Sequence, residues 1–117
     1  MGDFTLYHYP QCSKSRAAFE FLTSKGVDFA VVDYMKNPPS RATLQALADK
    51  MGGVRGLLRA NADVYAELGL ADAKWTDAQL LDFMGQHPVL LERPLLDSAK
   101  GARIGRPGPE VLADLLV

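Results

Sequence analysis

Apolar residues alternate with polar ones near both ends of the chain and recur at helical spacing between them. Residues 4–8 alternate and stop before Pro10, which predicts a first strand. Residues 28–34 have a β-branched apolar centre and predict a second strand. Between them lies a helical apolar face that ends at Gly26 and comprises Ala17, Ala18, Phe19, Phe21 and Leu22. A strand, a helix and a strand within about 35 residues form a right-handed βαβ unit, so we expect parallel neighbouring strands.

The segment from about residue 40 to residue 86 shows helical spacing and no strand pattern. Ser40 follows two prolines and suits the N-cap of a helix over 41–51. Shorter helical pieces are predicted over 54–58 and 63–68, and Thr76 is expected to cap a further helix that runs through Met84. The short apolar run Val89-Leu90-Leu91 fits either a turn of helix or a strand.

Sequence patterns typical of β-strands occur again near the end of the chain. Leu95-Leu96 and Arg103-Ile104 predict two strands, joined by a hairpin turn over 98–101. Pro109 suits the first position of a last helix. A βαβ half followed by a ββα half, with a cysteine at the first strand–helix junction, is the thioredoxin-like layout. We therefore expect one α/β domain over 1–117, with a mixed four-stranded sheet and a helical insertion at about 40–86.

Composition narrows the functional classes. A net charge of −1 gives no reason to expect nucleic acid as a partner, and no apolar run reaches the length of a membrane span. The opening residues do not resemble a secretion signal, so we expect a cytoplasmic protein without a membrane partner. One cysteine and two histidines exclude an internal disulfide and argue against a zinc site, so we expect neither a metal nor a bound cofactor.

The single cysteine, Cys12, lies where a thiol becomes reactive. At the first turn of a helix it faces unpaired backbone N–H groups and the positive end of the helix dipole, which stabilise a thiolate. An inert buried cysteine is the alternative, but the neighbours Gln11, Ser13, Lys14 and Ser15 are polar and favour an exposed site. We predict that Cys12 is a reactive thiol.

Cys12 has no internal partner with which to complete a redox cycle. The position three residues later, which is cysteine in a C-x-x-C motif, is Ser15. The C-x5-R loop of phosphatases is also absent, because Arg16 comes four residues after Cys12. An external thiol must therefore finish the cycle, and glutathione fits a reducing cytoplasm.

Three arginines lie next to residues that interrupt regular structure: Arg59 precedes Ala60-Asn61, Arg93 precedes Pro94 and Arg106 precedes Pro107. Guanidinium groups bind tetrahedral oxyanions through paired hydrogen bonds. Each could instead be a solvated residue or one half of an ion pair, and spacing alone does not bring them together. They are candidates for an oxyanion site.

Several motifs, in order along nearly the whole chain, resemble those of the glutaredoxin-coupled arsenate reductase family, particularly its short branch. They are Tyr7-His8-x-Pro10-x-Cys12-Ser13-Lys14-Ser15-Arg16, Tyr34-x-x-Asn37-Pro38-Pro39-Ser40-Arg41, Val54-Arg55-x-Leu57-Leu58-Arg59-x-Asn61, Glu92-Arg93-Pro94 and Ala102-Arg103-Ile104-Gly105-Arg106-Pro107. Tyr9 departs from the pattern, which often has asparagine there. The resemblance implies a thioredoxin-like fold with a helical insertion, and arsenate as the substrate.

The resemblance also implies residue roles. Cys12 would attack arsenic, and His8 would tune the thiol. Apart from the resemblance, the place of Ser15 near the helix start lets it either hydrogen-bond the sulfur or cap the helix. The oxyanion would be bound by Arg59, Arg93 and Arg106. Glutathione and glutaredoxin would supply the electrons, and we expect a monomer.

Two alternatives to an arsenate reductase remain open from the sequence. Spx-type regulators share this fold and bind RNA polymerase, but they commonly carry the C-x-x-C switch that Ser15 excludes here. The other alternative is a glutathione-dependent thiol oxidoreductase that acts on a different substrate.

Overall fold

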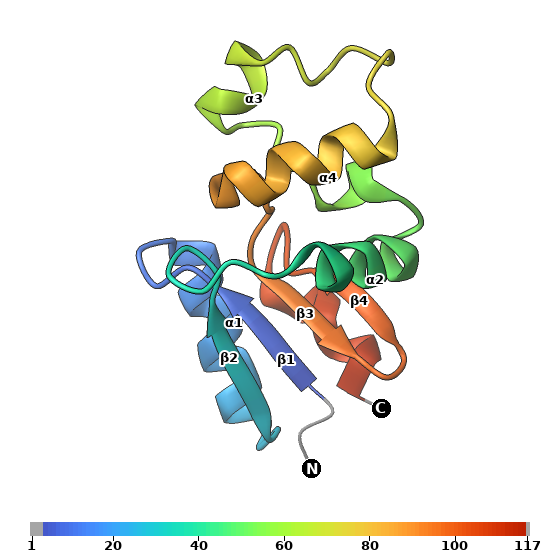
Figure 1. Cartoon of the computed structure of the whole chain (residues 1–117). Coiled ribbons are helices and arrows are strands. Elements are labelled where there is room, and N and C mark those ends of the chain that lie inside the picture. Colours follow the sequence, from blue (N-terminus) through green and yellow to red (C-terminus); the bar gives the residue numbers. More distant parts are fainter. Residues whose placement is uncertain (1–3, 117) are drawn as a thin grey trace. The chain divides into compact units, whose positions relative to one another are not determined.

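The structure is a computed structural model that describes residues 4–116 (Figure 1). The chain divides into two compact units. The first, the sheet unit, comprises the chain up to Asn37 and from Arg93 onward. The second, the helical unit, is the continuous segment Pro38–Glu92, which lies in sequence between the two halves of the first.

The sheet unit is built on four strands in the order β2-β1-β3-β4, which lie side by side in Figure 1. Strand β1 is parallel to β2 and antiparallel to β3, and β3 is antiparallel to β4. This confirms the predicted βαβ and ββα halves and the mixed thioredoxin-like sheet. The elements in chain order are β1 (Phe4–His8), α1 (Ser13–Ser24), β2 (Phe29–Asp33), β3 (Leu95–Ser98), β4 (Gly101–Ile104) and the 3₁₀-helix η3 (Pro109–Leu116).

The core of this unit lies between the sheet and the two helices α1 and η3. The central strands contribute Leu6 and Leu96, α1 contributes Leu22, and η3 contributes Leu112, all of them fully buried. Burying each such side chain contributes about 1.5–3 kcal/mol relative to leaving it exposed. This packing fixes α1 on the sheet, and with it the position of the residues at the helix start.

The helical unit begins with a capped helix, as the sequence predicts. The Ser40 side chain accepts a hydrogen bond from the backbone N–H of Thr43, and Thr76 forms a reciprocal capping box with Gln79. These caps explain why the two longer helices start where they do. The elements are α2 (Arg41–Met51), the 3₁₀-helix η1 (Val54–Leu57), α3 (Asp63–Glu67), α4 (Asp77–Gln86) and the 3₁₀-helix η2 (Pro88–Leu90).

One feature of this unit differs from the predicted all-helical segment. Leu58 and Leu91 form an isolated antiparallel bridge. Two backbone hydrogen bonds flank it, from the N–H of Arg59 to the carbonyl of Leu90 and from the N–H of Glu92 to the carbonyl of Leu57. Leu58 leaves η1 with an extended backbone, which allows this pairing. The apolar run over 89–91 is thus a turn of 3₁₀-helix that ends in a bridge.

None of the helices within residues 4–116 combines the length and the apolar character that crossing a membrane requires.

Candidate active site

Cys12 lies between the end of β1 and the start of α1. Its N–H donates to the carbonyl of Tyr9 at 2.9 Å, which closes a tight turn, and its own carbonyl accepts from the N–H of Arg16 at 3.0 Å. Cys12 is therefore the N-cap residue of α1, with an extended backbone, one position before the predicted first turn. Its side chain is partly buried. This position aims the open N–H groups of the helix start at the sulfur.

The surroundings of Cys12 lower the pKa of its thiol. Burial is the largest single influence and raises the pKa, because it disfavours the charged form. The backbone N–H of Ser15, the guanidinium of Arg93 and the backbone N–H of Lys14 act in the opposite direction by hydrogen-bonding the thiolate, and the charge of Arg93 adds to them. The net result is a pKa below that of an ordinary thiol. The sulfur is thus prepared to act as a nucleophile.

Two of the three predicted arginines meet at this sulfur. Arg106 Nη2 lies 3.7 Å from Cys12 Sγ, and Arg106 Nε donates to the carbonyl of Arg93 at 2.7 Å. Desolvation alone would lower the pKa of Arg93, but its contacts with Cys12 and Tyr34 outweigh burial and raise it, so the guanidinium stays charged. The chain thus places two cations beside a sulfur that is about 80 or more residues away in sequence.

The loops that carry these arginines are held close together. Arg93-Pro94 and Arg106-Pro107 are both cis peptides. The N–H of Gly105 donates to the carbonyl of Pro94 at 2.8 Å, and a Cβ on Gly105 would lie only 2.9 Å from the Pro94 ring. Glycine at position 105 therefore permits the close approach that brings Arg106 next to Arg93.

Lys14 ties the helix start to the second of these loops. Its Nζ donates to the carbonyl of Pro107 at 2.7 Å, across 93 positions of sequence. The side chain remains exposed, so the contact is open to solvent. The structure thus shows a link between α1 and the loop that carries Arg106.

His8 and Ser15 form a buried pair that supports the turn. His8 Nδ1 lies 2.7 Å from Ser15 Oγ, and the same oxygen accepts the N–H of Tyr9 at 2.9 Å. Ser15 is completely buried. Its hydroxyl therefore fastens the end of β1 to α1. The hydrogen bond that Ser15 gives to the sulfur comes from its backbone N–H.

The pKa of His8 is lowered, which bears on how it acts on the thiol. Burial is the main cause and Arg16 adds to it, whereas the nearby charge of Asp33 opposes them. A neutral ring at neutral pH follows, so His8 contributes through its hydrogen bond to Ser15 and not through a positive charge.

The third predicted arginine, Arg59, belongs to the helical unit. Its Nη1 lies 2.7 Å from Glu92 Oε1, and both side chains are largely buried, at 17% and 20% exposed. Its backbone N–H donates to the carbonyl of Leu90. Within its own unit Arg59 is therefore one half of an ion pair, the alternative that the sequence had left open.

Two tyrosines contact Arg93 and were missed in the sequence. The Arg93 guanidinium lies over the ring of Tyr9, 4.8 Å from its centroid, and it interacts with the fully buried Tyr34. Each tyrosine directly follows a strand, β1 or β2. Because the carboxyl ends of parallel neighbours meet at one edge of a sheet, this placement was the signal that could have identified them.

Cations and N–H donors, not metal ligands, surround the thiol. Within the described part of the chain, no group of three or more histidine, cysteine or acidic side chains is arranged to hold a metal ion. The site combines an ionisable sulfur with two guanidinium groups and the start of a helix. This arrangement can bind an anion next to a nucleophile.

Comparisons with known proteins show what this chain is similar to. Residues 7–113 match the sequence model of the ArsC family. The chain is 45% identical to an arsenate reductase of Escherichia coli over 117 residues, which are 99% of this chain and 82% of that protein. It is 38% identical to an arsenate reductase of Neisseria meningitidis, with 92% and 93% covered. Among solved structures, an arsenate reductase from Vibrio cholerae superposes with a TM-score of 0.90 at 36% identity, with 96% of both chains covered.

Proposed function

Because the chain belongs to the ArsC family, we propose that it is an oxidoreductase that reduces arsenate to arsenite, with Cys12 as the nucleophile. The observation that carries the proposal is the contact of a low-pKa thiol with two charged guanidinium groups. A thiolate alone would serve many thiol reactions. A thiolate flanked by two arginines is suited to attack on an oxyanion that those arginines hold.

Arsenate binding would rely on Arg93, Arg106 and the start of α1. Arg106 directs Nη2 toward the sulfur while its Nε is fixed to the Arg93 carbonyl, so its fork has a defined direction. The first N–H groups of α1 have no partners within the helix and favour negative charge. These donors would balance the charge of the oxyanion and of the sulfur that approaches it. The predicted oxyanion-binding role of Arg59 rests on its motif and stays a prediction.

The reaction would begin when the Cys12 thiolate forms a sulfur–arsenic bond and one arsenic–oxygen bond breaks, the oxygen leaving as water after protonation. Reduction of arsenic(V) to arsenic(III) needs two electrons, and joining two thiol sulfurs in a disulfide releases two. The chain has one cysteine, so the second sulfur must come from another molecule. We take glutathione for that role and glutaredoxin for reduction of the resulting disulfide, in the cytoplasm and with the protein as a monomer.

The proposal is tested by measuring arsenite formed from arsenate when glutathione and glutaredoxin are supplied. Cys12→Ser should abolish the activity. Arg93→Lys keeps the charge but loses the fork, and should reduce kcat/KM for arsenate by about tenfold or more. Arg41→Lys, an exposed arginine of the helical unit that is paired with Asp82, is the matched control and should change little. Arsenite formation that survives in Cys12→Ser would overturn the proposal.

A further inference from the structure

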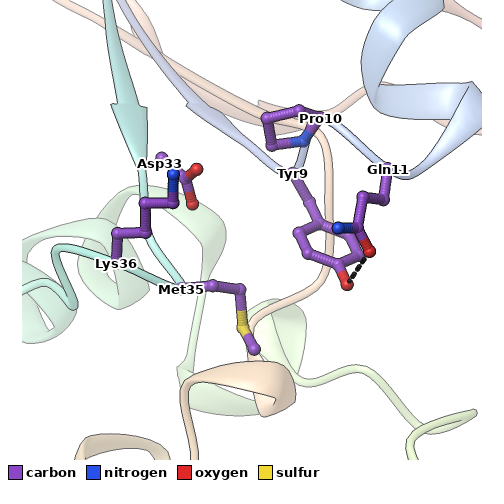
Figure 2. Close-up of a pocket in the computed structure, with 6 residues that line it drawn as sticks. All are labelled: Tyr9, Pro10, Gln11, Asp33, Met35 and Lys36. Atoms are coloured by element: carbon purple, nitrogen blue, oxygen red, sulfur yellow. Dashed lines mark hydrogen bonds between the residues drawn. The ribbon is translucent and has the colours of Figure 1, made fainter.

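A hollow opens beside the turn that carries Cys12. It has a volume of about 320 Å³. The turn Tyr9–Gln11 forms one wall. The opposite wall is formed by the last residue of β2 and the turn that follows it (Figure 2). The lining residues are Tyr9, Pro10, Gln11, Asp33, Met35 and Lys36. We call this hollow the turn pocket.

The turn pocket lies at the carboxyl ends of two parallel strands. β1 and β2 pair in register up to His8 and Asp33, and the chain turns immediately after each of them. The N–H groups of Lys36 and Asn37 both donate to the carbonyl of Asp33, which fixes the second turn. Small ligands of open α/β sheets bind at this edge, where side chains from successive loops converge.

The turn pocket shares one wall with the thiol site. The ring of Tyr9 lies under the Arg93 guanidinium, which hydrogen-bonds Cys12, and the same tyrosine lines the pocket. Its hydroxyl donates to Gln11 Oε1 at 3.0 Å (Figure 2). Gln11 is the residue directly before Cys12, so their Cα atoms are about 3.8 Å apart. The pocket is therefore adjacent to the turn that carries Cys12.

The charges in the pocket are of both signs. Asp33 brings a carboxylate, and Lys36 brings an ammonium group three residues later. The Oδ1 atom of Asp33 is buried and has no hydrogen-bond partner among residues 4–116. The exposed Met35 adds an apolar surface between the two turns. The pocket thus offers a carboxylate, an ammonium group and an apolar surface. These groups are complementary to a ligand that has an ammonium group, a carboxylate and a short aliphatic chain.

We propose that the turn pocket binds the γ-glutamyl end of glutathione, with Asp33 receiving its α-ammonium and Lys36 its α-carboxylate. The inference rests on the proposed use of glutathione as the second thiol. The glycine end of glutathione offers a carboxylate alone and would leave Asp33 unmatched. The γ-glutamyl end satisfies both charges, and its two methylene groups suit Met35. The cysteinyl thiol then lies on the Cys12 side of the pocket.

The test uses thiol–disulfide exchange, which needs no arsenate. The Cys12 thiolate attacks glutathione disulfide, the sulfur–sulfur bond of that disulfide breaks, a Cys12–glutathione disulfide forms, and one glutathione leaves as a thiolate that takes up a proton. Mass spectrometry of the full chain follows the rate. Hydroxyethyl disulfide, which carries no charge, is the reference, and the ratio of the two rates separates recognition from thiol reactivity.

Asp33→Asn and Lys36→Met should each lower the ratio of the rate with glutathione disulfide to the rate with hydroxyethyl disulfide. The expected decrease is about threefold to tenfold, as for a charged contact in an open pocket. Asp28→Asn, at the opposite end of β2, and Lys100→Met, in the β3–β4 turn, are matched controls and should leave it unchanged. Glutathione disulfide acetylated on both α-amino groups should react more slowly with the native chain and should lose that disadvantage in Asp33→Asn.

Unchanged ratios in both pocket variants would overturn the inference. A loss confined to Lys36→Met would also overturn it, because it would assign the pocket to the glycine carboxylate. Failure of arsenate reduction is a separate result: a chain that forms no arsenite but keeps the Asp33-dependent preference would refute the proposed function and leave the turn pocket standing.

Discussion

Removing the Arg106 guanidinium should make Cys12 harder to ionise. Arg106 Nη2 lies 3.7 Å from the sulfur. Two unit charges about 4 Å apart interact by about 1 kcal/mol in water and by about 4 kcal/mol at the effective dielectric constant near a protein surface. Because the thiol is only partly buried, the lower figure is the safer one. Arg106→Met should therefore raise the pKa of Cys12 and lower its ionisation constant by about fivefold or more.

The assay is a pH titration of Cys12, followed by the ultraviolet absorbance of the thiolate and by alkylation. The midpoint should move upward in Arg106→Met. At a fixed pH below the midpoint, alkylation should slow only about two- to threefold, because a thiolate of higher pKa is a better nucleophile. Arg106→Lys keeps a charge without the fork and should lie between the two. A midpoint that stays in place in Arg106→Met would refute the electrostatic argument.

Three further predictions concern the support of the site and the core. Ser15→Ala should destabilise the fold by about 1–3 kcal/mol in urea unfolding, because His8 Nδ1 and the N–H of Tyr9 lose their buried partner. Leu96→Ala, at a fully buried position of a central strand, should cost about 2–5 kcal/mol in the same measurement. Since burial lowers the pKa of His8, the unfolded chain binds more protons, so stability should fall as pH drops below about 6.5, and His8→Gln should weaken that dependence.

Local features of the sequence predicted the elements well. Ser40 and Thr76 cap the helices that they were expected to cap, and the strands over 4–8 and 28–34 are parallel neighbours. These features depend on neighbouring residues alone, through hydrogen bonds within one turn or the alternation of side chains along a strand. The isolated Leu58–Leu91 bridge was missed because its partners are far apart in sequence.

In the candidate site too, local properties could be predicted from the sequence and contacts between distant residues could not. The reactivity of Cys12 followed from its place before a helix, which is a local property. The approach of Arg93 and Arg106 to the sulfur depends on how the β3–β4 hairpin is seated next to β1 and on the Gly105–Pro94 contact. Sequence spacing contains neither, so the arginines could be named as candidates but not brought together.

The link from Lys14 to the Pro107 carbonyl has a consequence for how an anion is received. Together with the hydrogen bond from Arg106 to the Arg93 carbonyl, it connects the start of α1 to the two loops that carry the arginines around the sulfur. The two cations are thus held in register with the nucleophile before any substrate arrives. Little conformational freedom then remains to be lost on association, and more of the attraction to the ligand is expressed as affinity and correct orientation.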